Sequence, residues 1–151
     1  RGLGDVYKRQ SVDGDELGEH EGLMYHTIGQ RQGLRIGGLA NRPEAPWYVV
    51  DKNVTDNVLV VAQGNEHPAL FKMQLTAADV IWISGEPPTL PLACHAKIRY
   101  RQADQPCEVS ASGTKVQVSF ITPQRAVTPG QSVVFYDGDI CLGGGVIEAA
   151  Q

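Results

Sequence analysis

The feature that most constrains this 151-residue chain is a strict two-residue alternation between residues 92 and 100. Five apolar or aromatic side chains share one face of the predicted strand: Leu92, Cys94, Ala96, Ile98 and Tyr100. The polar side chains His95, Lys97 and Arg99 share the other face. Because successive side chains alternate across a strand but not across a helix, this stretch predicts a strand with one buried face.

The same period recurs through the second half of the chain. Val116, Val118 and Phe120 form another inward set. Further strands are predicted over residues 71–77, 79–83, 107–111, 132–136 and 140–147, with turns at Ser112-Gly113 and Asp137-Gly138. Six or so short strands at regular spacing, without helical periodicity, predict a closed six-stranded barrel. The fold class is therefore mainly β.

The first half has a less regular pattern. Helical spacing of larger side chains predicts a short helix over residues 23–32, with Gly33 as its stop. Two strands are predicted at Trp47–Asp51 and Asn57–Gln63. We expect a small β-rich central domain over residues 12–68 and a C-terminal β-barrel domain over residues 69–151. Residues 1–11 have no clear period, and we interpret them as an artefactual leader outside the fold.

Composition narrows the function classes. The net charge of −4 and the pI of about 5.5 exclude a basic nucleic-acid coat, so any nucleic-acid site must be a local patch. We find no apolar run near the roughly 18 residues of a membrane span and no signal peptide. The three cysteines are never spaced Cys-x-x-Cys, which argues against a zinc site or a secreted disulfide framework. We expect a cytoplasmic protein with no membrane partner.

Two basic patches stand out. Gly22–Pro43 contains no acidic residue but carries three arginines, including Arg31, among glycines that leave the backbone accessible. The local positive electrostatic potential of this segment suits an anionic partner, although a glycine-rich surface turn with solvated charges has the same composition. Lys97–Gln102 joins arginine to tyrosine, a combination that pairs with phosphate and stacks on bases. A barrel strand with solvated basic side chains is the alternative there.

No constellation for catalysis is recognisable. The four histidines are scattered, and none belongs to a signature with a serine or cysteine nucleophile. The glycines of Leu142–Val146 lie inside an apolar strand and favour a bulge or a close backbone approach over a phosphate loop. We therefore expect no catalytic residue, metal or cofactor within this chain.

Five motifs nevertheless occur together, in order and at suitable spacing. They are Gly22–Gly38, Pro46–Asp51, Arg99–Gln102, Pro123–Gln131 and Cys141–Ile147. Together they closely resemble the C-terminal part of the bacterial tRNA-specific 2-thiouridylase family, over roughly Val12–Ala149. The resemblance implies a central domain and a C-terminal β-barrel that both grip tRNA.

The resemblance also implies a chemistry for the full-length enzyme. The family activates the wobble uridine of tRNA with ATP and Mg²⁺ as an adenylate. It then replaces the 2-oxygen with sulfur carried as a cysteine persulfide, so a persulfide sulfur-donor protein is an expected partner. In family terms, Arg99, Tyr100 and Gln131 match tRNA-contacting positions. The loop that begins at His26 and includes Gln30 and Arg31 is expected near the catalytic centre, where it meets tRNA.

The departures from the family limit what this chain can do. The family's Ser-Gly-Gly-Val-Asp-Ser type ATP loop is absent, and so are both catalytic cysteines. Cys94, Cys107 and Cys141 do not match the catalytic positions. We expect a tRNA-binding portion of a 2-thiouridylase that is inactive alone. The alternative is a β-barrel protein-interaction or assembly module without RNA binding, which the acidic net charge also fits.

Overall fold

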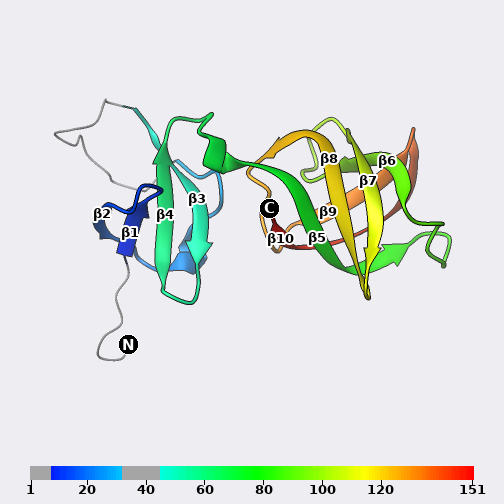
Figure 1. Cartoon of the computed structure of the whole chain (residues 1–151), viewed down its shortest axis with the longest axis horizontal. Coiled ribbons are helices and arrows are strands. Elements are labelled where there is room, and N and C mark those ends of the chain that lie inside the picture. Colours follow the sequence, from blue (N-terminus) through cyan, green and yellow to red (C-terminus); the bar gives the residue numbers. More distant parts are fainter. Residues whose placement is uncertain (1–7, 32–44) are drawn as a thin grey trace. The chain divides into compact units, whose positions relative to one another are not determined.

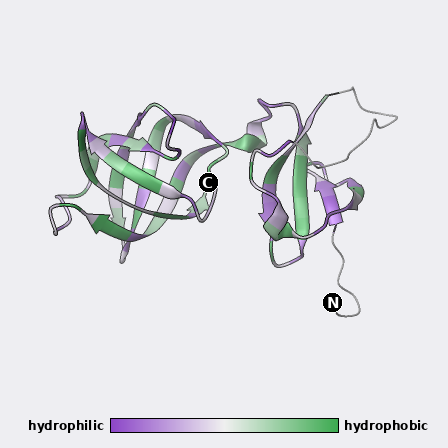
Figure 2. Cartoon of the chain, turned by 180° about the vertical axis from the view of Figure 1, so that it is seen from behind, coloured by the Kyte–Doolittle hydropathy of each residue, from purple (hydrophilic) through white to green (hydrophobic). Residues whose placement is uncertain are grey.

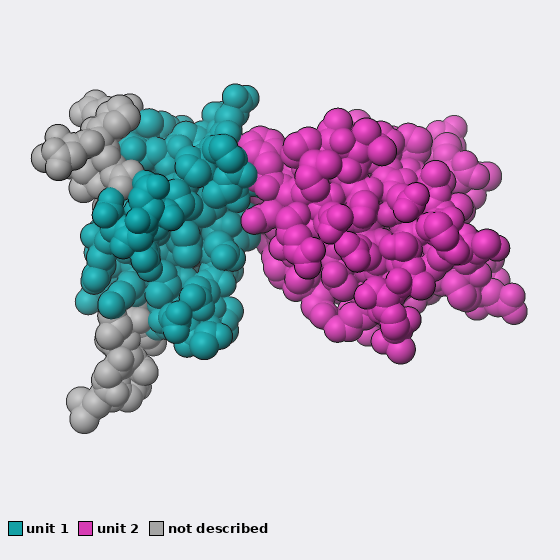
Figure 3. Space-filling view, in the orientation of Figure 1, with its two compact units in different colours: residues 1–70 teal, residues 71–151 magenta. Residues whose placement is uncertain are grey.

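The chain divides into two compact units, residues 1–70 and residues 71–151 (Figures 1 and 3). The structure is a computed structural model, and it describes residues 8–31 and 45–151. Its described residues form ten strands and two single-turn 3₁₀ helices, so the prediction of a mainly β fold is confirmed.

The first unit is a four-stranded sheet with the strand order β2-β1-β4-β3. Its strands are β1 (Lys8–Ser11), β2 (Glu16–Glu19), β3 (Trp47–Asn53) and β4 (Val58–Gln63). A small core of Trp47, Val49, Leu59 and Val61 lies against one face. The β3–β4 hairpin was predicted by its apolar runs, whereas the other two strands were not.

Strand β1 corrects the expectation that residues 1–11 lie outside the fold. Lys8–Ser11 pair in parallel with β4, from Lys8 opposite Val58 to Ser11 opposite Val61. The strand is held by backbone hydrogen bonds, and only Ser11 of its four residues is buried. A polar strand of this kind has no apolar alternation, which explains why the sequence pattern missed it. Residues 1–7 lie outside the described residues.

The predicted helix over residues 23–32 is wrong beyond its first turn. Only η1 (Leu23–Tyr25) is helical. The backbone N–H of Gln30 donates to the carbonyl of Thr27 at 2.9 Å, and Gly29 between them has φ 88°. A positive φ at the third position is the requirement of a type II turn, so Gly29 turns the chain instead of continuing a helix. Gln32 and Gly33 lie outside the described residues.

The second unit is a closed six-stranded barrel, as predicted, and the structure gives its strand order as β10-β5-β8-β7-β6-β9. A turn of 3₁₀ helix, η2 (Pro68–Leu70), leads into it. The strands are β5 (Phe71–Trp82), β6 (Leu92–Lys97), β7 (Gln105–Ser112), β8 (Lys115–Arg125), β9 (Ser132–Asp137) and β10 (Ile140–Ala150). The two strands expected over residues 71–83 are one strand, in which Asp79 has φ 52°.

Figure 2 shows hydrophobic residues recurring along the barrel strands. The side chains of 14 buried residues form the barrel core. The inward sets Cys94, Ala96, Ile98 and Val116, Val118, Phe120 are all buried, as their two-residue period predicts. Tyr100 is the exception, because its side chain is 94% exposed. Strand β6 ends at Lys97, so the alternation no longer applies where the chain turns at Ile98–Gln102.

Three consecutive glycines, residues 143–145, allow β10 to pack closely against β5 and β9. A Cβ on Gly143 would overlap the carbonyl oxygen of Ile81 on β5. A Cβ on Gly144 would lie 2.6 Å from the carbonyl oxygen of Val133, and one on Gly145 would lie 2.7 Å from that of Ala78. The predicted close backbone approach is therefore confirmed at all three glycines.

Candidate nucleic-acid interface

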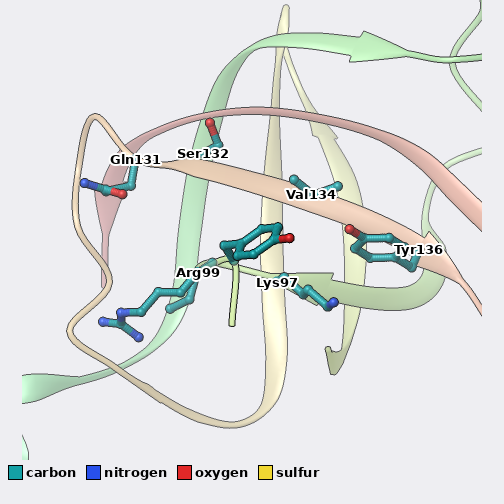
Figure 4. A pocket seen from close by; sticks show the side chains of 8 residues that line it. Lys97, Arg99, Gln131, Ser132, Val134 and Tyr136 are labelled. Atoms are coloured by element: carbon teal, nitrogen blue, oxygen red, sulfur yellow. The ribbon is translucent and has the colours of Figure 1, made fainter. Parts of the chain in front are cut away.

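A cavity of about 340 Å³ opens where β6 ends beside β9. We call it the barrel pocket, and its lining residues are Lys97, Ile98, Arg99, Tyr100, Gln131, Ser132, Val134 and Tyr136. Antiparallel pairing of the two strands sets Lys97 opposite Val134 and His95 opposite Tyr136. Figure 4 shows Arg99 and Gln131 toward one end of the pocket and Lys97 and Tyr136 toward the other.

Arg99 anchors the loop that carries Tyr100. Its Nη2 donates to the carbonyl oxygens of Arg125 and Ala126, each at 2.7 Å. Burial, followed by the charge of Arg125, lowers the pKa of Arg99 below its ordinary value. A guanidinium with five donors can hold these two carbonyls and still present its remaining edge to an anion. Arg99 therefore combines a fixed position with a positive charge at the pocket.

Gln102 holds the other end of this loop. Its Oε1 accepts from the backbone N–H of Ile98 at 3.1 Å, and its Nε2 donates to Oε1 of Gln124 at 2.9 Å. Gln124 is buried, and its own Nε2 donates to the carbonyl oxygen of Thr122. The motifs Arg99–Gln102 and Pro123–Gln131, far apart in sequence, thus meet through hydrogen bonds. The loop is fixed at both ends while Tyr100 stays exposed.

The remaining pocket side chains offer stacking faces and polar groups. Lys97 Nζ lies 5.2 Å from the ring centroid of Tyr136, within cation–π distance. Gln131 is exposed, and its backbone is held because its carbonyl accepts from the N–H of Ile147 at 2.8 Å. Cations for phosphate, aromatic rings for bases and an amide for hydrogen bonding are the groups that bind single-stranded or looped RNA.

The other predicted residues lie in the first unit. His26 is buried, and its Nδ1 lies 3.5 Å from Nε2 of Gln30. Burial, then the charge of His20, lowers the pKa of His26 from its ordinary value of 6.5. Its Nε2 has no hydrogen-bond partner within residues 8–31 and 45–151. Gln30 fixes the type II turn, because its Oε1 accepts from the N–H of Thr27 at 2.9 Å.

Arg31 is exposed at the end of this turn. The other two arginines of the first basic patch, Arg35 and Arg42, lie outside the described residues. His20 is a satisfied turn histidine: its Nδ1 accepts from the N–H of Gly22, so its Nε2–H donates to the carbonyl of Asn57 at 2.9 Å. This bonding uses both ring nitrogens and argues against a role for His20 as a ligand.

The structure thus brings the six predicted residues together in two groups. Arg99, Tyr100 and Gln131 line the barrel pocket, whereas His26, Gln30 and Arg31 share one turn of the first unit. Sequence reasoning missed Ser132 and Tyr136, because the pairing of β9 with β6 is not local. The available signal was the alternation itself: Val133 and Phe135 point inward, so their neighbours must face out.

Residues 8–31 and 45–151 hold no group of three histidine, cysteine or carboxylate side chains suited to a metal ion. The same residues contain no helix with the length and apolar character needed to cross a membrane.

Comparisons with known proteins match both units. Residues 3–63 match the family model described as tRNA methyl transferase PRC-barrel domain, and residues 72–147 match the one described as aminomethyltransferase beta-barrel domain. The chain is 57% identical to the tRNA-specific 2-thiouridylase MnmA of Marinomonas sp. over 97% of its own length and 37% of that protein's. It is 61% identical to the protein of the same name from Hahella chejuensis, over 90% of the chain and 37% of the relative. For that of Salmonella typhimurium the identity is 58%, over 91% and 38%.

Proposed function

Because the chain belongs to the tRNA-specific 2-thiouridylase family, we propose that it supplies the tRNA-binding portion of such an enzyme. The chain spans less than two fifths of the length of these relatives. Residues 12–68, together with the strand Lys8–Ser11, act as the central domain, and residues 69–151 act as the C-terminal β-barrel domain. The substrate is a tRNA whose wobble uridine the complete enzyme thiolates.

The observation that carries this proposal is the barrel pocket. Arg99 and Lys97 supply positive charge for phosphate, and Tyr100 offers a fully exposed ring on a loop pinned at both ends. A pinned loop loses little conformational freedom when a base stacks on its ring, which favours binding. Gln131 adds a hydrogen-bonding amide. His26, Gln30 and Arg31 form the second contact region, in the first unit.

ATP and Mg²⁺ belong to the proposed full-length enzyme and not to this chain. The family's phosphate-binding loop is missing from the sequence, and the glycines at 143–145 are pressed against the backbones of β5 and β9. The residues present do not fit a nucleotide, so no catalytic step is assigned to them. Cytoplasmic location and a persulfide sulfur-donor protein as partner complete the proposal for the full-length enzyme.

Binding of unmodified tRNA by fluorescence anisotropy tests the proposal. We expect Tyr100→Ala to weaken binding about five-fold or more, since stacking of one base on an aromatic ring contributes about 1–3 kcal/mol. Arg99→Ala should cost about 1 kcal/mol or more through lost phosphate pairing and a released loop. Lys115→Ala is the control, because it also removes one positive charge, which is paired with Glu148 and lies on the β7–β8 hairpin outside the pocket lining.

Equal affinities for the wild type, Arg99→Ala and Tyr100→Ala would show that the barrel pocket is not the tRNA-binding site.

The second candidate function, a protein-interaction module, is favoured by the outward isoleucines Ile81 and Ile83, which are 73% and 68% exposed. Amide signals in NMR spectra separate the two functions. Addition of tRNA should shift the signals of Arg31, Arg99 and Gln131, whereas an interaction module leaves them unchanged.

A further inference from the structure

Two of the three cysteines face each other inside the barrel. Cys94 on β6 lies directly opposite Cys107 on β7, and their Sγ atoms are 3.9 Å apart. Both thiols are free and both side chains are buried, at 7% and 5% exposure. Neither residue belongs to the barrel pocket or to the proposed tRNA contacts.

The register of the two strands suits a covalent bond. Directly opposed residues of antiparallel strands have Cα atoms about 4.5 or 5.5 Å apart, depending on the hydrogen-bonding position. Both separations fall within the span of about 4.4–6.8 Å that disulfides bridge. Side-chain rotation can therefore bring the sulfurs to bonding distance while the β6–β7 ladder stays paired.

The two thiols also differ in their pKa. The hydrogen bond between the two sulfurs lowers the pKa of Cys94, whereas the same bond, together with burial, raises the pKa of Cys107. Because the thiolate is the reactive form of cysteine, this difference favours Cys94 as the first site of oxidation. Cys107 then remains as the protonated partner within reach of an oxidised Cys94.

We propose that Cys94 and Cys107 are a modification site, at which a peroxide converts the pair into a cross-strand disulfide. The Cys94 thiolate attacks one peroxide oxygen, the O–O bond breaks, and the products are a sulfenic acid and hydroxide. The sulfur of Cys107 then attacks the sulfenic sulfur, and the sulfenic oxygen leaves as water with the Cys107 proton. Overall, two thiols and one hydrogen peroxide give one disulfide and two waters.

The disulfide would close a ring around the loop that carries Arg99 and Tyr100. The two cysteines flank the β6–β7 connection, and β6 also pairs with β9 at the edge of the pocket. A cross-link between strands that are already paired restricts the unfolded chain more than the folded one. We therefore expect the oxidised barrel to keep its fold and to melt at least about 5 °C higher.

Cys141→Ser protein isolates the pair, because Cys141 on β10 is the one cysteine with a partly exposed side chain. The purified chain is treated with hydrogen peroxide, the reagent is removed by catalase, and thiols are counted with maleimide in denaturant. We expect both thiols to disappear, the mass to fall by about 2 Da through loss of two hydrogens, and dithiothreitol to restore both. Peptide mapping should join the peptides containing residues 94 and 107.

A second protein, with Cys141→Ser and Cys107→Ser together, serves as the matched control. It keeps Cys94 but lacks the resolving thiol, so it should gain oxygen and form no intramolecular disulfide. Three results would overturn the proposal: both thiols still titrate after treatment, the disulfide joins two chains, or the oxidised barrel melts at a lower temperature than the reduced one.

Discussion

The two units of this chain solve the same problem, burying apolar side chains with β-strands, in different ways. In the barrel every strand has two neighbours, and the interior core contains 14 buried residues. Within residues 8–31 and 45–70, the first unit is an open sheet with β2 and β3 at its two ends, and its core cluster contains four buried residues. Closure removes unpaired edges, so we expect the barrel to be the more stable unit.

The two units also differ in how well their buried polar side chains are hydrogen-bonded. Gln124 in the barrel is buried but hydrogen-bonded on both sides of its amide. The two buried side-chain nitrogens without a partner among the described residues are Arg9 Nε and His26 Nε2, both in the first unit. A buried donor or acceptor without a partner costs stability. We therefore expect the barrel to be the more rigid unit, and the sheet of the first unit, with its turn at Gly29, to change conformation more easily.

The largest expected effect is that of Gly143→Val in the barrel. The new side chain would overlap the carbonyl of Ile81, and Gly143 has φ 154°, a conformation that valine rarely adopts. We expect a loss of about 4 kcal/mol or more, which would open the β5–β10 pairing. Urea unfolding followed by circular dichroism measures it. Gly138→Asn is the control, since a Cβ there meets nothing within 4 Å; equal losses in both variants would contradict barrel closure through this contact.

The next effect tests the small core of the first unit. Leu59 is fully buried, and Leu59→Ala should cost about 3 kcal/mol by removing apolar contacts and leaving a cavity. Trp47 belongs to the same core cluster, so its fluorescence in a Trp82→Phe background reports the unfolding of this sheet. Val54→Ala, at a position 78% exposed in the β3–β4 turn, should leave that transition in place. An unchanged transition in Leu59→Ala would mean that the sheet does not depend on this core.

The smallest effect is a pH dependence confined to the first unit. The folded pKa of His26 is lowered below the unfolded value of about 6.5, so the unfolded chain binds the proton more strongly. Stability is therefore complete above pH of about 6.5 and declines as the pH falls from there through the folded pKa. The Trp47 transition should weaken as the pH falls below about 6.5, and His26→Gln should flatten that slope. His95→Gln, an exposed barrel position, should leave it intact.

The sequence predicted the barrel better than the sheet, for physical reasons. A barrel strand has one face toward the interior and one toward solvent, so apolar and polar residues alternate along it. The buried faces that contain Ala96 and Val118 could therefore be predicted from the sequence. The same rule failed at Tyr100 because β6 ends before it. In the first unit, β1 is held by backbone pairing, which leaves no apolar pattern. The turn at Gly29 depends on a positive φ that helical spacing does not reveal.

In the candidate site, too, some residues could be predicted from the sequence and others depend on long-range contacts. Arg99, Tyr100 and Gln131 were predicted from motifs, and they lie around one pocket. The contribution of Tyr136 depends on β9 pairing with β6, a contact between segments about forty residues apart that no local pattern encodes. The hydrogen bonds from Arg99 to the carbonyls of Arg125 and Ala126 were likewise hidden, because they join a side chain to a distant backbone.

The central claim is that this chain binds tRNA through basic and aromatic side chains. Titration with unmodified tRNA at two salt concentrations tests it most directly. Because phosphate contacts release counterions, we expect binding that weakens about ten-fold or more between about 50 and 200 mM salt. Absence of binding at the lower salt concentration, or an affinity that does not change with salt, would contradict the account.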